Sequence, residues 1–229
     1  LLLFVFTSNT DSFLFAKSTS KKTVSKKDSF SPKKNPIKID NFRDGNFSVK
    51  PEWWNFGQVS MVVVDNSADI KALKKDKNKI QLGKKSLKVQ GITSRYFSGG
   101  VGVYLGLDGF DYTNLVMTIY SPEIHSGIIR IELFDDDNGN NRVDFGLNKD
   151  MPDSDDVLVY NLTVNWSGWK TVRIPLEYFE DDNPRVGDNI FNPYRINRSA
   201  GLIQMQLVFL SIRKPERELL FKFDYIGFE

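Results

Sequence analysis

Short runs in which apolar and polar residues alternate dominate the chain from about residue 38 onward. A period of two is typical of β-strands that bury one face, and turn signals such as Asn138-Gly139 separate the runs. The pattern predicts about nine strands: Met61–Val64, Ser86–Gln90, Val101–Leu105, Leu115–Tyr120, Ile128–Phe134, Val157–Val164, Lys170–Ile174, Leu202–Ile212 and Leu219–Phe228. Helical periodicity is nearly absent, and the lysine-rich segment 68–79 is interpreted as a solvated loop rather than a turn of helix. We therefore expect an all-β fold, a two-sheet antiparallel β-sandwich.

The alternation also separates two faces on individual strands. In Ile128–Phe134, three aliphatic side chains point one way, whereas Arg130 and Glu132 point the other way. The segments around Gln206 and Tyr120 show the same division. Two interpretations are open: an ordinary solvent face, or a shallow platform of polar and aromatic groups on which a sugar chain could lie.

Composition limits the available chemistry. The chain has 229 residues, 40% of them hydrophobic and 26% charged, which suits a packed core. It contains no cysteine, which excludes disulfides and thiolate metal sites. The single histidine, His125, leaves little room for a histidine-based metal site or general base.

The first 37 residues differ in character from the rest. The apolar run that begins at Leu1 and ends at Ala16 is interpreted as the remnant of a secretory signal peptide (1–16), and we expect the chain to start inside a longer reading frame. Eight lysines and one acidic residue lie between Lys17 and Lys38, and residues 17–37 are expected to be a disordered linker. A nucleic-acid arm is the alternative, disfavoured because Phe30 is its only aromatic residue. The apolar run is shorter than the roughly 20 residues that a membrane span requires, so no transmembrane span is predicted.

Five segments of the body occur in a familiar order: Ile39–Gly45, Trp53–Gly57, Gly83–Val89, Trp169–Leu176 with Phe179, and Phe223–Phe228. Their order and spacing resemble the galactose-binding-like β-sandwich superfamily, and specifically carbohydrate-binding modules of the family-eleven type; the complex I assembly-factor domain is a related sandwich. The resemblance covers residues 38–229. It implies a jelly roll whose concave face takes a glycan chain. It also implies a structural calcium ion near the chain ends, with Asp40, Asp44 and Asp224 in the matching positions.

Members of this family bind sugar through tyrosines and charged groups on the concave face. By strand position, the corresponding candidates here are Tyr104, Tyr120, Arg130, Glu132, Gln204 and Gln206. Trp53 and Trp54 are adjacent, so in a strand one enters the core and the other is free to reach a ligand. Trp54 is the one retained as a candidate.

A second candidate metal cluster lies in the segment 135–144, which carries Asp135, Asp137, Asn138 and Asp144. Carboxylate and amide oxygens are suitable calcium ligands. The segment is not a standard calcium-binding loop, because placing Gly139 at the invariant sixth position puts Phe134 at the first. A solvated acidic loop is the alternative.

The function expected from the sequence is non-catalytic binding of a polysaccharide or oligosaccharide by a secreted, periplasmic or cell-surface protein, with structural Ca²⁺. A second hypothesis is a structural or assembly protein of the cell envelope, similar to flagellar sheath proteins, that uses the sandwich to contact other proteins or domains. A third is a small glycosidase, for which Glu132 and Glu177 are the acids to test, although no spacing in the sequence fixes a catalytic pair. We expect no enzymatic activity.

Overall fold

A computed structural model describes residues 35–75, 79–109, 111–145, 152, 154–195, 199–212 and 214–229. The expected signal-peptide remnant (1–16) and nearly all of the expected linker (17–37) lie outside these ranges. Within the described part of the chain, no helix is long and apolar enough to cross a membrane.

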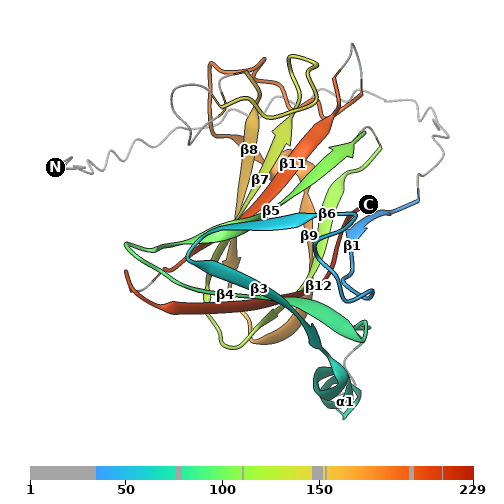
Figure 1. The fold of residues 1–229 in the computed structure, drawn as a ribbon, viewed down its shortest axis with the longest axis vertical. Coiled ribbons are helices and arrows are strands. Elements are labelled where there is room, and N and C mark those ends of the chain that lie inside the picture. Colours follow the sequence, from blue (N-terminus) through green and yellow to red (C-terminus); the bar gives the residue numbers. More distant parts are fainter. Residues whose placement is uncertain are drawn as a thin grey trace, which may run out of the picture. The chain divides into compact units, whose positions relative to one another are not determined.

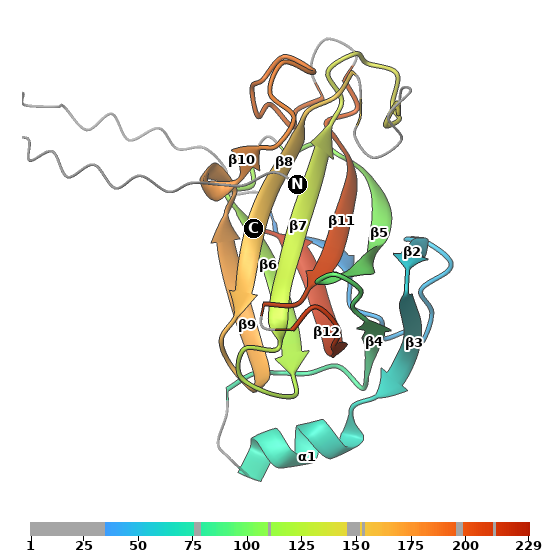
Figure 2. The same ribbon diagram turned by 90° about the vertical axis from the view of Figure 1, so that its left-hand side faces the viewer.

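The described residues form two antiparallel sheets of six strands each (Figures 1 and 2). The two-sheet sandwich is as predicted, but there are twelve strands where about nine were expected. Sheet I has the order β3-β4-β12-β6-β9, and β1 pairs with β12. Its strands are β1 (Ile37–Asp40), β3 (Val59–Asp65), β4 (Lys85–Ile92), β6 (Asn114–Ser121), β9 (Gly168–Pro175) and β12 (Glu218–Phe228). Sheet II has the order β10-β8-β7-β11-β5-β2. Its strands are β2 (Trp53–Gly57), β5 (Phe97–Leu107), β7 (Gly127–Asp135), β8 (Val157–Val164), β10 (Glu180–Asp181) and β11 (Leu202–Leu210).

The core is formed by the apolar sides of both sheets. On β7 and β11, alternate residues such as Ile131 and Leu207 are fully buried. They belong to the same cluster as Phe221 and Phe223 of β12 in sheet I. Because side chains alternate along each strand, the remaining side chains of β7 and β11 are directed to the outer face of sheet II.

One helix corrects the sequence interpretation. Residues Ser67–Lys75 form α1, although segment 68–79 was expected to be a solvated loop. None of its residues is buried, so the hydrophobic pattern carries little signal for it. Its charges favour a helix instead: Asp69 lies in the first turn, the last turn is basic, and Asp69 Oδ2 accepts a 2.7 Å hydrogen bond from Lys222 Nζ of β12.

The long connections gather at one end of the sandwich. Both views show the segments that follow β7 and β10 close together at this end, with α1 at the opposite end (Figures 1 and 2). One end of sheet II, the sheet that contains Arg130, therefore carries two acidic loops.

A substitution at the buried Phe209 would test the packing of the core. Its ring centroid lies 5.5 Å from that of Phe221 and 6.3 Å from that of Phe223. Phe209→Ala should lower the free energy of unfolding by about 3–5 kcal/mol, because a cavity replaces these contacts. Val62→Ala, at a position that is 48% exposed, should cost less than about 1 kcal/mol. Urea unfolding measures both, and equal losses would contradict this description of the core.

Candidate functional site

Residues on the outer face of sheet II are aligned in rows that cross three or four strands. The strand register defines them: Gln206 is opposite both Glu132 and Gly102, and Gly102 is opposite Trp54. In strand order β7-β11-β5-β2, the central row is Glu132, Gln206, Gly102 and Trp54, and the next row is Arg130, Val208, Gly100 and Phe56. A third row contains Phe134, Gln204 and Tyr104. The residues of these rows therefore form one continuous surface, to which β7, β11, β5 and β2 all contribute.

This surface is hollowed into an open groove with a volume of about 630 Å³. Its lining combines a polar group with a surrounding set of apolar side chains. The lining residues are Trp54, Phe56, Phe97, Arg130, Glu132, Phe134, Phe145, Gln206, Val208 and Leu210.

Two glycines of β5 allow aromatic rings to lie close against the sheet. A Cβ atom on Gly102 would be 2.4 Å from Cζ2 of Trp54, and one on Gly100 would be 2.6 Å from Cζ of Phe56. Any larger residue would thus collide with these rings. The ring of Tyr104, 64% exposed, extends the surface with a centroid distance of 4.5 Å to Trp54.

The polar centre of the groove is a guanidinium held by two carboxylates. Arg130 Nε donates to Glu132 Oε1, and Arg130 Nη2 donates to Asp182 Oδ2, both at 2.6 Å. Burial raises the pKa of Glu132, against the opposing effect of Arg130. Burial alone would lower the pKa of Arg130, but its hydrogen bonds and charge interactions with Glu132 and Asp182 raise it overall. Arg130 stays charged, and its position is fixed from two sides.

Most of the sugar-binding candidates meet in this groove. Trp54, Arg130, Glu132 and Gln206 line it, and Tyr104 adjoins Trp54. Gln204 lies in the third row but is 3% exposed, so it presents little surface.

Tyr120 is the exception, because it belongs to sheet I. It lies on β6, where its ring centroid is 5.5 Å from that of Trp169 and Lys222 Nζ is 4.7 Å from its ring centroid. The expectation that it shares a face with Arg130 is therefore wrong. The alternation predicted on which side of its strand Tyr120 lies, but it does not determine to which sheet that strand belongs.

Several groove residues were not identified as candidates from the sequence. They are Phe56, Phe97, Phe134, Phe145, Val208 and Leu210. The spacing in the sequence could have predicted two of them. Phe56 lies two residues after Trp54, and Phe134 lies two residues after Glu132, so each shares a strand face with a candidate. Phe145 lies in the connection after β7, where no periodicity applies.

The acids that the resemblance implies for calcium do not fit a common metal site here. Asp40 uses both carboxylate oxygens: Oδ1 accepts from the backbone of Asn41 and Phe42, and Oδ2 accepts a 2.9 Å hydrogen bond from Trp53 Nε1. Asp224 Oδ1 accepts from Gly83 N at 2.7 Å. Asp44 Oδ1 accepts from Asn46 N within a turn. Among the described residues, these three acids do not form a group with mutually close ligand atoms.

A different acidic group does come together at the loop end of sheet II. One oxygen atom each from Asp135, Asp137 and Asp156 lies within 4.8 Å of the others. Asp135 ends β7 and is 0% exposed, while Asp156 directly precedes β8 and is 1% exposed. Asp156 was not among the candidates predicted from the sequence, because nothing local in the sequence pairs it with Asp135.

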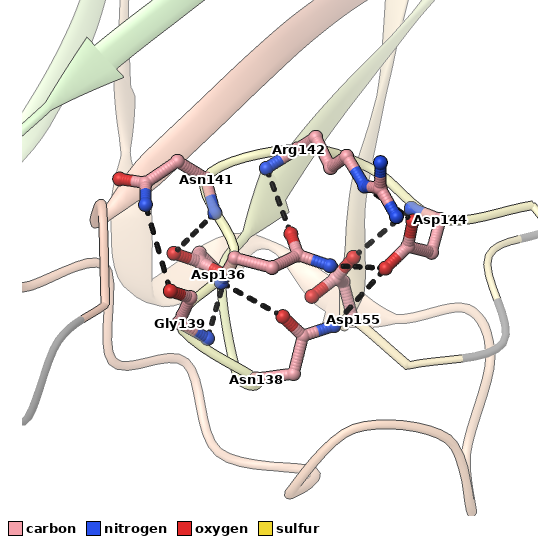
Figure 3. A network of polar contacts seen from close by, with 8 residues as sticks. Asp136, Asn138, Gly139, Asn141, Arg142, Asp144 and Asp155 are labelled. Carbon is pink, nitrogen blue, oxygen red and sulfur yellow. Dashed lines mark hydrogen bonds and ion pairs between the residues drawn. The ribbon is translucent and has the colours of Figure 1, made fainter.

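Asn138 and Asp144, the other two members of the predicted cluster, are engaged elsewhere in the loop (Figure 3). Asn138 Nδ2 donates to Asp144 Oδ2 at 3.4 Å, and Arg142 forms a 2.9 Å ion pair with Asp144. Asp136 accepts from the backbone N–H groups of Gly139, Asn140 and Asn141, and Asp155 accepts from those of Asp137 and Asp144. These acids stabilise the turn, whereas Asp135, Asp137 and Asp156 face one another.

The electrostatics of the three-aspartate group reflect burial and mutual repulsion. Burial and the charges of Asp137 and Asp156 raise the pKa of Asp135 to about 8, although a hydrogen bond from Asn192 N opposes this rise. Burial, followed by the charges of Asp137, Asp181 and Asp188, raises the pKa of Asp156 to about 7. The pKa of Asp137 is also raised, mainly by burial. Without a counter-charge, this group does not hold three negative charges at neutral pH.

Comparison with solved structures identifies carbohydrate-binding modules as structural neighbours. The family 11 carbohydrate-binding module of a cellulosomal cellulase of Clostridium thermocellum superposes with a TM-score of 0.52 at 15% sequence identity, covering 85% of this chain and 94% of that one. A family 11 module from the same organism in complex with a β-1,3-1,4-mixed-linked tetrasaccharide gives a TM-score of 0.51 at 16% identity, covering 84% and 94%. No family model and no curated protein matches the chain. The expected resemblance is confirmed at the level of the fold.

The close approach of Trp54 to Gly102 can be tested by a double-mutant cycle. Gly102→Ala should lower the free energy of unfolding by about 1–3 kcal/mol, because the new methyl group overlaps the indole. In a Trp54→Ala background the same change should cost much less, since the three heavy atoms nearest to that methyl group belong to Trp54. A cost that is the same in both backgrounds, measured by urea unfolding, would show that the indole does not occupy this place.

The raised pKa values predict how the stability of the metal-free protein depends on pH. In the folded state Asp135 and Asp156 keep their protons up to about pH 8 and about pH 7, whereas the unfolded chain releases them near 3.8. Their contribution to stability is complete below that lower value and is lost as the pH rises through the folded pKa values. The free energy of unfolding in chelator should therefore fall between about pH 5 and pH 8, by up to about 1.4 kcal/mol per pH unit and group.

Urea unfolding across this pH range provides the measurement for that prediction. Asp156→Asn should reduce the slope, because the amide does not titrate. A flat or rising profile for the metal-free protein would contradict the prediction.

Proposed function

We propose that the chain is a non-catalytic glycan-binding module whose ligand lies along the outer face of sheet II. The observation that carries this proposal is the groove itself, in which aromatic rings surround a fixed group of hydrogen-bonding side chains. Sugars present both apolar C–H faces and hydroxyl groups. A surface of this mixed kind matches them better than it matches a purely apolar ligand.

The apolar contribution comes mainly from Trp54 and Phe56. The lack of side chains at Gly100 and Gly102 keeps both rings close to the sheet, so that a sugar ring can stack on them from the solvent side. Tyr104 extends the same surface beyond Trp54. The aromatic part is therefore elongated, which suits a chain of sugar units more than a single monosaccharide.

Hydroxyl groups would be bound by Arg130, Glu132 and Gln206. Together these provide guanidinium and amide donors as well as carboxylate and amide acceptors. From β2 to β7 the central row spans three inter-strand distances, or about 14 Å. A ligand stacked on Trp54 and extended across the strands would reach Glu132.

Charge in the groove favours a neutral glycan. Among the described residues that line it, Arg130 is the only cationic one, and two carboxylates already neutralise it. Acidic polysaccharides would meet Glu132 and Asp182 without a free counter-charge. Since a structural neighbour was solved with a β-1,3-1,4-mixed-linked tetrasaccharide, mixed-linkage β-glucan is the first probe to test.

The geometry suits binding more than hydrolysis. A glycosidase needs two carboxyl groups on either side of the scissile bond, one of them able to donate a proton. Glu132 instead forms a 2.6 Å ion pair with Arg130, and Glu177 lines a different cavity together with Asn114 and Tyr194. The two acids considered for catalysis therefore do not form a pair.

Binding a polysaccharide outside the cell requires export, which we include in the proposal.

Affinity electrophoresis in gels that contain mixed-linkage β-glucan, xyloglucan, xylan or pectin tests the function. The folded chain should be retarded by a neutral glucan and not by pectin. Trp54→Ala should weaken binding at least about tenfold, since a lost stacking contact costs on the order of 1.4 kcal/mol. Gln206→Ala should also weaken it, through lost hydrogen bonds.

Tyr120→Ala provides the matched control, because it removes an aromatic ring from the other sheet. This variant should bind the glucan like the unmodified chain. If no glycan retards the folded protein, or if Trp54→Ala binds normally while Tyr120→Ala does not, the proposed groove is not the site.

A further inference from the structure

The three-aspartate group has free ligand atoms in a buried place. Asp135 and Asp156 are almost completely buried, and each has one carboxylate oxygen, Oδ1, without a hydrogen-bond partner. Oδ1 of Asp137 is likewise buried and unpartnered. Buried carboxylate oxygens are rarely left without a partner, so these three atoms point to a ligand.

The second oxygen of each carboxylate is held by the backbone. Asp135 Oδ2 accepts from Asn192 N at 3.2 Å, Asp137 Oδ2 from Asp156 N at 2.9 Å, and Asp156 Oδ2 from Ile190 N at 3.1 Å. These bonds fix the orientation of all three side chains. The carboxylates are thus preorganised, with one oxygen anchored and the other available.

Within the part of the chain that the structure describes, no basic side chain forms an ion pair with the group. Among the ion pairs of the described residues, none involves Asp135, Asp137 or Asp156. Three carboxylates so close together repel one another when ionised, and burial strengthens this repulsion. A bound cation would remove it and would satisfy the free oxygens at the same time.

We propose that Asp135, Asp137 and Asp156 bind a divalent cation, calcium, at the loop end of sheet II. Calcium is a hard cation that prefers oxygen ligands at 2.3–2.6 Å, and oxygens within 4.8 Å of one another can share one ion at these distances. Its usual six to eight ligands leave places for main-chain carbonyls and water. This site is distinct from the acids Asp40, Asp44 and Asp224, and the proposal does not depend on glycan binding.

Gly187 brings a third chain segment to the site. A Cβ atom at this position would lie 2.2 Å from Asp156 Oδ1 and 2.3 Å from Asp137 Oδ2, and the residue has a φ of +66°. The backbone after β10 therefore passes directly over the carboxylates, which only glycine permits. A cation here would join this segment to the ends of β7 and β8.

Calorimetric titration of the full chain, first freed of metal with chelator, tests the proposal. We expect one calcium ion per chain and a rise in melting temperature on addition of calcium, with magnesium binding more weakly. No calcium binding by the folded protein would overturn the proposal, and tighter binding of magnesium would overturn the assignment to calcium.

Variants assign the binding to these residues. Asp156→Asn and Asp137→Asn should each weaken calcium binding at least tenfold and abolish the calcium-dependent rise in melting temperature. In chelator they should melt at or above the temperature of the unmodified chain, because each removes a repelling charge, and this separates lost metal binding from lost folding. Asp144→Asn, a neutralised aspartate of the same loop region, should bind calcium normally. If the Asp156 and Asp137 variants bind like the unmodified chain, the ion lies elsewhere.

Discussion

The alignment of β7, β11, β5 and β2 is the constraint on which the groove depends. Residues such as Ile131 and Leu207 must face sheet I to be buried, so their neighbours Glu132 and Gln206 face outward. A shift of one residue between two of these strands would turn the core residues to solvent and the groove residues inward. The free energy of packing the core therefore also fixes the register of the groove, and the outer face needs no separate stabilisation to hold its rows in place.

Carboxylates serve three different purposes in this protein. Asp40 and Asp136 accept hydrogen bonds from backbone N–H groups and hold turns together. Glu132 and Asp182 orient Arg130 in the groove. In the group around Asp156, each carboxylate has one buried oxygen without a hydrogen-bond partner. Carboxylates therefore act as turn stabilisers or as partners for an arginine, and in the proposed site as metal ligands, depending on what the surrounding chain provides.

Sequence reasoning identified the fold class, most strands and much of the groove, because alternation directly encodes which side of a strand a residue occupies. It correctly separated Trp53, which is 3% exposed, from Trp54, which lines the groove. It failed for Tyr120, because strand pairing is set by contacts between distant segments. The same limit applies to Asp156, which meets Asp135 only when the two strands flanking a long connection pair. α1 escaped notice because it buries none of its residues.

The position of β2 at the edge of sheet II has a consequence for the dynamics of the groove. β2 pairs with β5 alone, yet it carries both Trp54 and Phe56. Edge strands open locally at a smaller free-energy cost than central ones, so Trp54 and Phe56 lie in a less protected part of the sheet than Arg130 and Gln206. A ligand that contacts both β2 and β11 would connect this edge strand to a central strand of the sheet. Amide hydrogen exchange in β2 would then slow on binding. The free energy needed to keep β2 paired with β5 would lower the observed affinity for the ligand.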